Sequence, residues 1–235
     1  MASTFTLSDS AVFCSTLIKG QVLNINNQMP GLMMGNIVLQ RILGAPFIWR
    51  ANRANASIPI TEAGGTDYVM SLPLLGRIET QWLTDSSGNE MPLEGAIALP
   101  KNSNVARPVK VAPQYDNNAG SITMRFDQTP DASYTAYFDY QQKAQLMTSF
   151  GSSWGPVADE YSYIFNLGLL AFAGLVVNDA RFPIWEKDFI SSLLATQDGL
   201  DEQAKAIFIG DWMNVTRTAA RSQAMGQSGA QARNQ

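Results

Sequence analysis

The stretch from Tyr161 to Asp211 constrains the fold more than any other part of the chain. It opens with the longest apolar run of the sequence, Tyr163 to Val177, in which large apolar side chains recur at three- and four-residue intervals and others fill the opposite side. A helix that is apolar almost all the way round must be buried by several neighbours. The run is 15 residues long, too short to cross a membrane, so a core helix in a soluble protein is expected.

Four further helices are expected from apolar periodicity and from helix-start residues. Two follow the core helix, one opened by Pro183 and one from Leu200 to about Arg221, and two precede it, over Leu7 to Leu23 with Ser8 as N-cap and from Pro30 to about Leu43. The side chains expected to face a core include Val12, Phe13, Thr16, Leu17, Leu32, Met33, Ile37, Leu39, Leu43, Ile184, Trp185, Phe189, Ile190, Leu193, Leu194, Ala204, Ile207, Phe208, Trp212 and Val215.

Between Ser57 and Tyr140 the pattern changes to short segments rich in β-branched and aromatic residues, separated by turn residues. Two hairpins are expected. In one, Ile78–Leu83 pairs with the segment that follows it, and in the other Ser121–Phe126 turns into Tyr134–Tyr140. Three prolines interrupt the polar stretch from Pro100 to Gly120, which predicts a long exposed loop or an edge strand.

These segments predict an α+β fold, in which a helical bundle built from both ends of the chain carries an inserted antiparallel β-hairpin or sandwich region. The expected divisions are helices in residues 1–50 and 141–221, the β-region in 51–140 and a flexible C-terminal arm in 222–235. Beyond Arg221 the sequence contains mainly Ser, Gln, Ala, Gly and Arg, with no apolar residue larger than Met225, so the arm is expected to be disordered on its own.

The chain is poor in charge. Only 15% of its residues are charged, against about a quarter in typical soluble domains, while 46% are hydrophobic. Such a surface indicates either many neutral polar residues or cover by other subunits. The net charge of −4 argues against a protein that grips nucleic-acid phosphates, yet an acidic protein can still surround DNA without holding it.

Few residues are available for catalysis or metal binding. The chain has no histidine and one cysteine, Cys14, and it lacks both nucleotide-binding glycine fingerprints. Its acidic clusters, such as Asp159-Glu160 and Asp198, stand at expected helix starts, where capping explains them. Asp116-Asn117-Asn118 lacks the pattern of a calcium loop and is interpreted as a turn. No catalytic, cofactor or metal site is therefore expected.

The segment from Phe138 to Asn214 resembles the C-terminal half of phage head-to-tail connector (adaptor) proteins. The similarity rests on the Tyr140-Gln-Gln-Lys segment and on the helix entry Pro156-Val-Ala-Asp-Glu-Tyr161. It also rests on the turn Asp179-Ala-Arg-Phe-Pro183 and on the spacing of Gly199-Leu200, Ile207-Phe208 and Asp211-Trp212.

The resemblance implies a non-enzymatic virion protein, made in the host cytoplasm and placed at the head–tail junction. It implies a ring of about twelve copies that joins the portal protein to a tail or nozzle protein, with double-stranded DNA passing through the lumen without sequence-specific binding and with no membrane contact. On this basis the C-terminal region is expected to dock on the portal through Trp212, Asn214, Arg217, Arg221, Met225 and Arg233. Contacts with neighbouring subunits or with the tail are expected from Asp85, Asn89, Lys101, Arg107 and Lys110.

Two alternatives belong to other functional classes. A carbohydrate- or receptor-binding β-module would use Trp82, Tyr134 and Tyr137 for stacking, although the even-numbered aromatic residues of the Tyr134–Tyr140 segment are expected to pack against the bundle. An enzyme that works through paired carboxylates would depend on Asp159 or Asp198.

Overall fold

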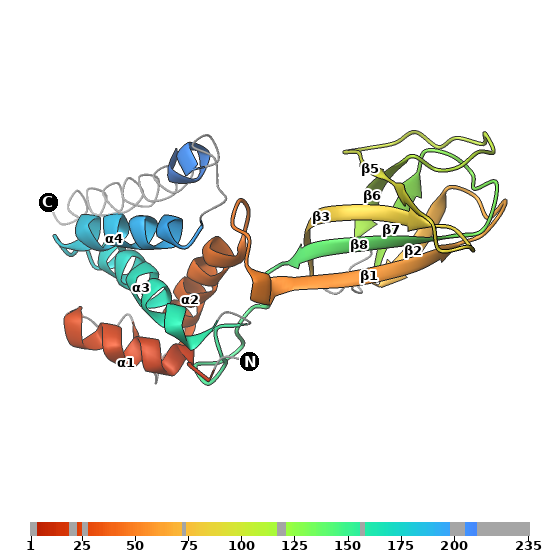
Figure 1. Ribbon diagram of the computed structural model, residues 1–235. Coiled ribbons are helices and arrows are strands. Elements are labelled where there is room, and N and C mark those ends of the chain that lie inside the picture. Colours follow the sequence, from red (N-terminus) through yellow and green to blue (C-terminus); the bar gives the residue numbers. More distant parts are fainter. Residues whose placement is uncertain are drawn as a thin grey trace, which may run out of the picture. The chain divides into compact units, whose positions relative to one another are not determined.

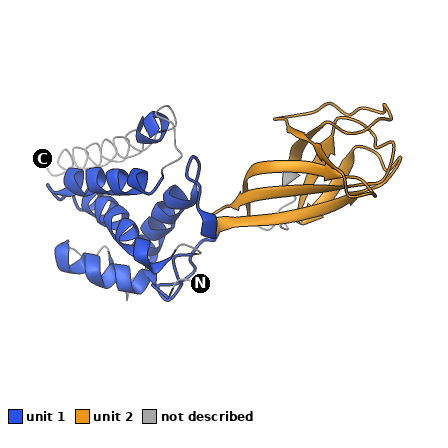
Figure 2. Cartoon of the chain, in the orientation of Figure 1, with its two compact units in different colours: residues 1–51, 144–235 blue, residues 52–143 orange. Residues whose placement is uncertain are grey.

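The computed structural model describes residues 4–18, 23–24, 28–71, 74–116, 121–155, 158–197 and 205–210. The chain divides into two compact units (Figure 2). The helical unit contains Met1–Ala51 and Ala144–Gln235, and the β unit contains the continuous stretch Asn52–Lys143. Each unit has a hydrophobic core of its own.

The helix α3 (Ser162–Val176) is the central element of the helical unit (Figure 1). It packs against α1 (Leu7–Leu17), α2 (Gln28–Leu43) and α4 (Phe182–Ala195). Every residue from Gly168 to Leu175 is buried, so the expected core helix surrounded by neighbours is observed. A 3-10 turn, η3 (Asp159–Tyr161), precedes α3, and a further short helix covers residues 205–210.

Gly168 allows α2 and α4 to lie close to α3. A Cβ atom at this position would stand 2.6 Å from Cγ1 of Val38 on α2 and 2.9 Å from Cε2 of Phe189 on α4. Both distances are shorter than real Cβ contacts, and both neighbours are fully buried. The three helices therefore meet at a point where only glycine fits.

The helix α1 begins with a capping box. The Thr6 hydroxyl accepts a bond from the Asp9 backbone N–H, and the Asp9 carboxylate accepts one from the Thr6 backbone N–H. The predicted cap, Ser8, is wrong, because Ser8 already lies inside the helix. The predicted end near Leu23 is also wrong, since Ile18 is extended and α1 stops at Leu17.

The β unit consists of two four-stranded sheets with the orders β1-β8-β3-β4 and β2-β7-β6-β5. The buried side chains of both sheets form one core cluster, which places the core between them. Residues alternate between buried and partly exposed along β7 and β8, as a half-buried strand requires. The strands are β1 (Arg53–Ile60), β2 (Asp67–Ser71), β3 (Leu75–Thr84), β4 (Glu90–Pro92), β5 (Glu94–Gly95), β6 (Lys110–Asp116), β7 (Ser121–Phe126) and β8 (Tyr134–Gln142).

Only one of the two predicted hairpins is present. β3 and β4 pair as expected, with Trp82 opposite Pro92. β7 and β8 belong to different sheets, so the second hairpin is wrong: their connection crosses from one layer to the other instead of making a turn within a sheet. The prediction of a loop or edge strand from Pro100 to Gly120 is also wrong in part. Within that stretch β6 lies inside its sheet, between β7 and β5, and runs parallel to β5.

The predicted fold class is therefore wrong. The chain is α+β, but it is not a helical bundle that carries a small antiparallel insertion. Strands form a large compact unit with two sheets, and one of these sheets is mixed. The even-numbered aromatic side chains of β8, Phe138 and Tyr140, belong to the core of this β unit, whereas the prediction packed them against helices.

Candidate functional site

The helix α1 has apolar side chains on both of its faces. Its inner face, towards α3, contains small buried side chains such as Ala11 and Cys14. Its outer face contains Val12, Phe13 and Leu17, whose exposed fractions are 55%, 49% and 38%. The prediction that these three residues face the core is wrong, because the small side chains of the opposite face are the ones that let α1 approach α3.

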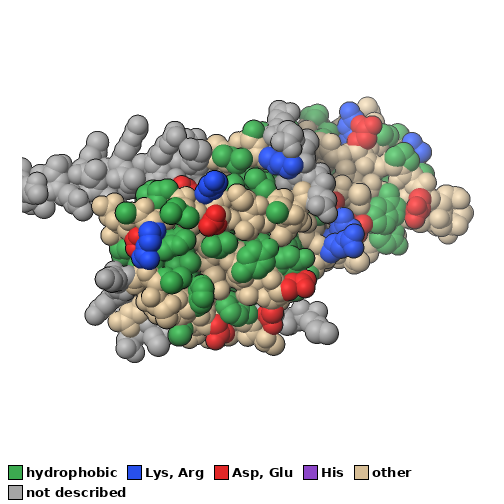
Figure 3. Space-filling view, turned by 60° about the vertical axis from the view of Figure 1, so that its left-hand side comes forward, with side chains coloured by type: hydrophobic (Ala, Val, Ile, Leu, Met, Phe, Trp, Pro, Cys, Tyr) green, Lys and Arg blue, Asp and Glu red, His purple; other side chains and the backbone are tan. Residues whose placement is uncertain are grey.

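Large apolar side chains also point outward from the other helices of this unit. Met29 and Met33 on α2 are well exposed, and so are Ile184 on α4 and Ile207 in the 205–210 helix. The space-filling view shows apolar side chains, in green, gathered in patches on the face that comes forward, with only isolated charges among them (Figure 3). Exposed apolar patches of this kind mark surfaces that meet a partner.

Charged residues are few in α1 and α2, whereas α4 contains three, Glu186, Lys187 and Asp188. Asp9 is the only one in α1, Arg41 is the only one in α2, and α3 has none. The buried centres of protein–protein interfaces are depleted in charge in the same way. The exposed faces of α1 and α2 therefore have the composition of an interface centre, and we take the apolar outer surface of the helical unit as the candidate site.

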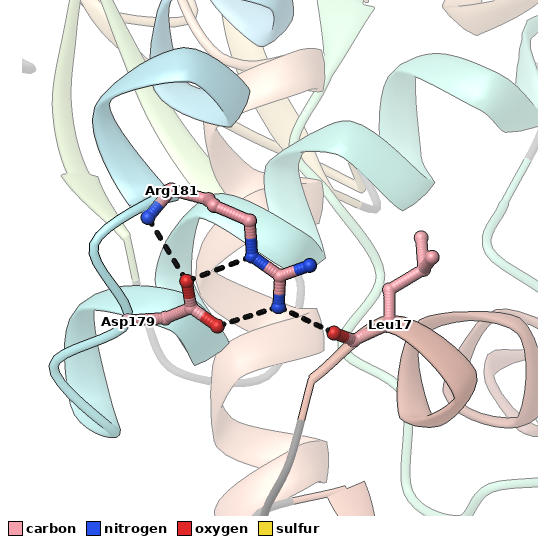
Figure 4. Close-up of polar contacts among 3 residues, drawn as sticks. All are labelled: Leu17, Asp179 and Arg181. Atoms are coloured by element: carbon pink, nitrogen blue, oxygen red, sulfur yellow. Dashed lines mark hydrogen bonds and ion pairs between the residues drawn. The ribbon is translucent and has the colours of Figure 1, made fainter.

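Two residues of the turn between α3 and α4 hold the C-terminal end of α1 (Figure 4). One guanidinium nitrogen of Arg181, Nη2, donates to the backbone carbonyl of Leu17 at 2.7 Å and to Asp179 Oδ2 at 2.7 Å. Nε of Arg181 donates to Asp179 Oδ1 at 3.0 Å, so the pair is bidentate. The guanidinium also lies 4.9 Å from the ring centre of Trp185.

The other end of the N-terminal segment is held by Asp159. Its carboxylate accepts bonds from the Thr4 backbone N–H, the Thr4 hydroxyl and the Phe5 backbone N–H, at 2.6 to 3.3 Å. Two motifs that carry the resemblance, the helix entry with Asp159 and the turn with Asp179 and Arg181, thus fasten both ends of α1 to the second half of the chain. They keep the outer face of α1 in place.

The contribution of the Asp179–Arg181 pair to stability is expected to depend on pH. The hydrogen bonds from Arg181 lower the pKa of Asp179 from 3.8 to about 2. Because the folded pKa lies below the unfolded one, the stabilisation is complete above about pH 4 and is lost as the pH falls through about 2. Urea unfolding should show wild type more stable than Asp179→Asn near neutral pH, with a difference that shrinks between pH 4 and 2. A constant difference, or an equal effect of the control Asp188→Asn, would contradict this.

Cys14 is buried on the inner face of α1, where its Sγ lies 3.6 Å from the backbone carbonyl oxygen of Asn166. Burial raises the pKa of this thiol to about 12, so almost none of it is thiolate at neutral pH. Its reaction with a disulfide reagent at pH 8 is expected to be negligible in the folded chain and rapid in denaturant. The matched control is Ser15→Cys, which places an exposed thiol one residue further along and should react at once. Fast reaction of folded wild type would show that α1 opens readily.

The predicted contact residues of the β unit lie in well-defined turns and strands. The Asp85 carboxylate accepts bonds from the backbone N–H groups of Ser87 and Asn89 and from the Asn89 side chain, which closes the turn and lowers the pKa of Asp85. Asp85 and Asn89 therefore bond to each other, and the side-chain oxygens of Asp85 are engaged inside the turn.

The three predicted cationic contacts are separated. Lys110, in β6, lies 3.9 Å from the carboxylate of Glu94. Lys101 is exposed, and its charge adds to the hydrogen bond from Arg125 that is the main cause of the lowered pKa of Asp67. Arg107 is exposed, and among the described residues the only two predicted contact residues that bond to each other are Asp85 and Asn89.

The predicted portal-docking residues Trp212, Asn214, Arg217, Arg221, Met225 and Arg233 lie outside the described residues. Their assignment stays a prediction. The helix at 205–210 is the last described element before them, and Phe208 within it is buried with its ring centre 4.6 Å from that of Phe47.

The aromatic residues of the carbohydrate-binding alternative make contacts within the sheet. Trp82 and Tyr137 are opposite each other on β3 and β8, and their rings stack at 5.3 Å with an angle of 8°. Both are half-buried, as a stabilising cross-strand pair requires. The Tyr134 hydroxyl donates to Asp131 at 2.8 Å. The sheet therefore accounts for these residues without a ligand.

The described residues offer little for catalysis or metal binding. No group of three or more acidic or cysteine side chains among them is arranged to hold a metal ion. The carboxylate of Asp159 is engaged by Thr4 and Phe5, and Asp198 lies outside the described part. Within that part, no helix has both the length and the apolarity to cross a membrane.

Sequence reasoning missed several exposed apolar residues. Ile97, just after β5, is completely exposed, and Val69 and Val105 are exposed as well. Alternation along β2 places Val69 on the same face as Asp67 and Ser71 and so indicated its exposure, whereas no local pattern distinguished Ile97 or Val105 from core residues. For α1 a signal was available: its two helical faces are both apolar, and the face with the smaller side chains is the one that packs closely.

No protein-family model matches this chain, and no curated protein matches it.

Proposed function

We propose that this chain is a non-enzymatic structural subunit that assembles with copies of itself into the head-to-tail adaptor ring of a tailed phage. The ring joins the portal to the tail and surrounds the DNA that passes between them. The observation that carries the proposal is the apolar, charge-poor outer surface of the helical unit, above all Val12, Phe13 and Leu17 on α1. A surface of this kind is costly to leave in water and suits permanent contact between subunits.

Two further observations support the proposal. Asp159, Asp179 and Arg181, which belong to the motifs of the resemblance, hold α1 in place and so organise the same surface. The net charge of −4 suits a channel wall along which DNA slides without being gripped.

The test is the state of assembly of the purified chain. Light scattering and electron microscopy should show closed rings, either of the chain alone or after mixing with the portal protein encoded by the same genome. The chain should also be present in purified particles. A chain that stays monomeric alone and with the portal, and that is absent from particles, would overturn the proposal.

The proposed portal-docking arm can be tested separately. Deletion of residues 222–235 is expected to abolish binding to the portal, because it removes Met225 and Arg233 from the proposed contact. The circular dichroism and thermal unfolding of the remaining chain should stay as in wild type. Normal portal binding by the shortened chain would remove the arm from the proposal and leave the ring untouched.

A further inference from the structure

The helical unit has exposed apolar residues on two different sides. α3 lies between α1 and α4, so the outer faces of these two helices point away from each other (Figure 1). On α1 the outer face contains Val12, Phe13 and Leu17, and we call these residues together with Asp9 the α1 face. On α4 the most exposed apolar residue is Ile184, with 60% of its surface free.

The outer face of α4 continues from Ile184 through Lys187 to Ser191, at intervals of three and four residues, and all three residues are exposed. We call this set the α4 face. Opposite it, Phe189 and Leu193 are fully buried against the core. The α4 face therefore combines one large apolar side chain with one cation, one helical turn apart.

The two faces carry opposite charges. Both bonds from Thr6 to Asp9 go to Oδ2, and no described residue donates to Oδ1. Lys187 forms no ion pair with any described residue. Asp188 is on the flank of α4, about 100° round the helix from Lys187. Each face thus has, beside an exposed apolar group, a charge that forms no ion pair with a described residue.

The spacing of these groups fits an antiparallel packing of the two helices. Asp9 precedes Phe13 by four residues, about 6 Å along the axis, and Lys187 follows Ile184 by three residues, about 4.5 Å. When Phe13 of one copy packs on Ile184 of another and the helices run in opposite directions, Asp9 meets Lys187. If α1 packed on a second α1, the contact would contain two Asp9 carboxylates and no cation. If α4 packed on a second α4, it would contain two Lys187 side chains without Asp9.

We infer that the α1 face of one copy packs against the α4 face of the next, with Phe13 against Ile184 and Asp9 paired with Lys187. A contact between two different faces of the same chain is heterologous, and it generates a ring when the rotation from one copy to the next closes. The inference rests on the proposed ring and names the surfaces that form it.

Disulfide cross-linking between copies tests the contact. Phe13→Cys protein and Ile184→Cys protein are mixed under assembly conditions, with the portal protein where it is needed, oxidised and run on a non-reducing gel. Covalent dimers are expected in the mixture and not in either variant alone. A chain with both substitutions should give a ladder of covalent oligomers up to the closed ring. The buried thiol of Cys14 does not compete.

The matched control is Ser15→Cys mixed with Ile184→Cys, since Ser15 is exposed on the same helix but on the flank away from Phe13. This mixture should give no dimer. Lys187→Glu should slow formation of the Phe13–Ile184 cross-link by roughly two- to fivefold, and Lys187→Arg should leave it unchanged.

The outcomes separate this inference from the proposed function. Rings that assemble without a Phe13–Ile184 cross-link overturn the inference and leave the adaptor ring standing. Cross-links in Phe13→Cys protein alone show that α1 meets a second α1, which also overturns it. Absence of any assembly, with or without the portal, overturns the ring itself.

Discussion

Replacement of Phe138 by alanine is expected to lower the free energy of unfolding of the β unit by about 3–5 kcal/mol. Phe138 is on β8, a central strand with β1 on one side and β3 on the other, and its side chain is completely buried. Its ring contributes to the core between the two sheets, so its removal loses apolar burial and leaves a cavity. Urea unfolding measures the lost free energy of unfolding. Hydrogen exchange should show that the loss of protection is confined to residues 52–143.

The control for Phe138 is the next residue along the strand. Tyr137 points to the other face of β8, is half-buried and stacks on Trp82. Tyr137→Ala removes an aromatic ring of similar size, but because that ring is only half-buried the substitution should cost less than Phe138→Ala; the lost stacking on Trp82 accounts for about 0.5–1.5 kcal/mol of the cost. If the two substitutions cost the same, the core of the β unit does not lie where the structure places it.

Replacement of Gly168 by alanine is expected to destabilise the helical unit by about 1–3 kcal/mol. The sign of this change in stability is informative, because replacement of glycine by alanine inside a helix ordinarily stabilises a protein by about 1 kcal/mol. Here the new methyl would stand 2.6 Å from Val38 and 2.9 Å from Phe189, and α2 or α4 would have to move away from α3. Thermal unfolding checks the direction.

Gly210 provides the comparison for Gly168. It lies in the 205–210 helix and a Cβ there would meet nothing within 4 Å, so Gly210→Ala should be neutral or stabilising. Stabilisation by both substitutions would mean that α2, α3 and α4 have room to spare at Gly168, contrary to the packing described.

The elements that depend on local sequence could be predicted. The apolar side chains all round the helix identified α3 as a core helix, and the change of period located β7, which runs from Ser121 to Phe126 as expected. Local pattern does not specify which strands pair. β7 and β8 are close in sequence, yet they lie in different sheets, and the fold class was mispredicted because the strands were treated as hairpins.

The candidate site was less predictable than the fold. Periodicity shows that α1 has an apolar face, but it cannot say which of two apolar faces is covered, and steric fit decides in favour of the face with Ala11 and Cys14. Asp85 and Asn89 are predicted contacts with other subunits or the tail, and in the structure their side chains mainly close their own turn. Asp179 and Arg181 were noticed as part of a motif, whereas their bond to Leu17 joins residues far apart in sequence.

The two attachments of α1 impose an order on events at the ribosome. The carboxylate that holds Thr4 is 155 positions further along the chain, and the guanidinium that holds Leu17 is 164 positions further along. At about 5–20 residues per second, α1 waits roughly 10–30 s after its own synthesis before the groups that anchor it exist. The β unit is continuous in sequence and is completed during that interval. For this time the inner face of α1 lacks α3, its partner in the finished subunit, so both apolar faces of α1 are exposed and the nascent chain needs protection most at its beginning.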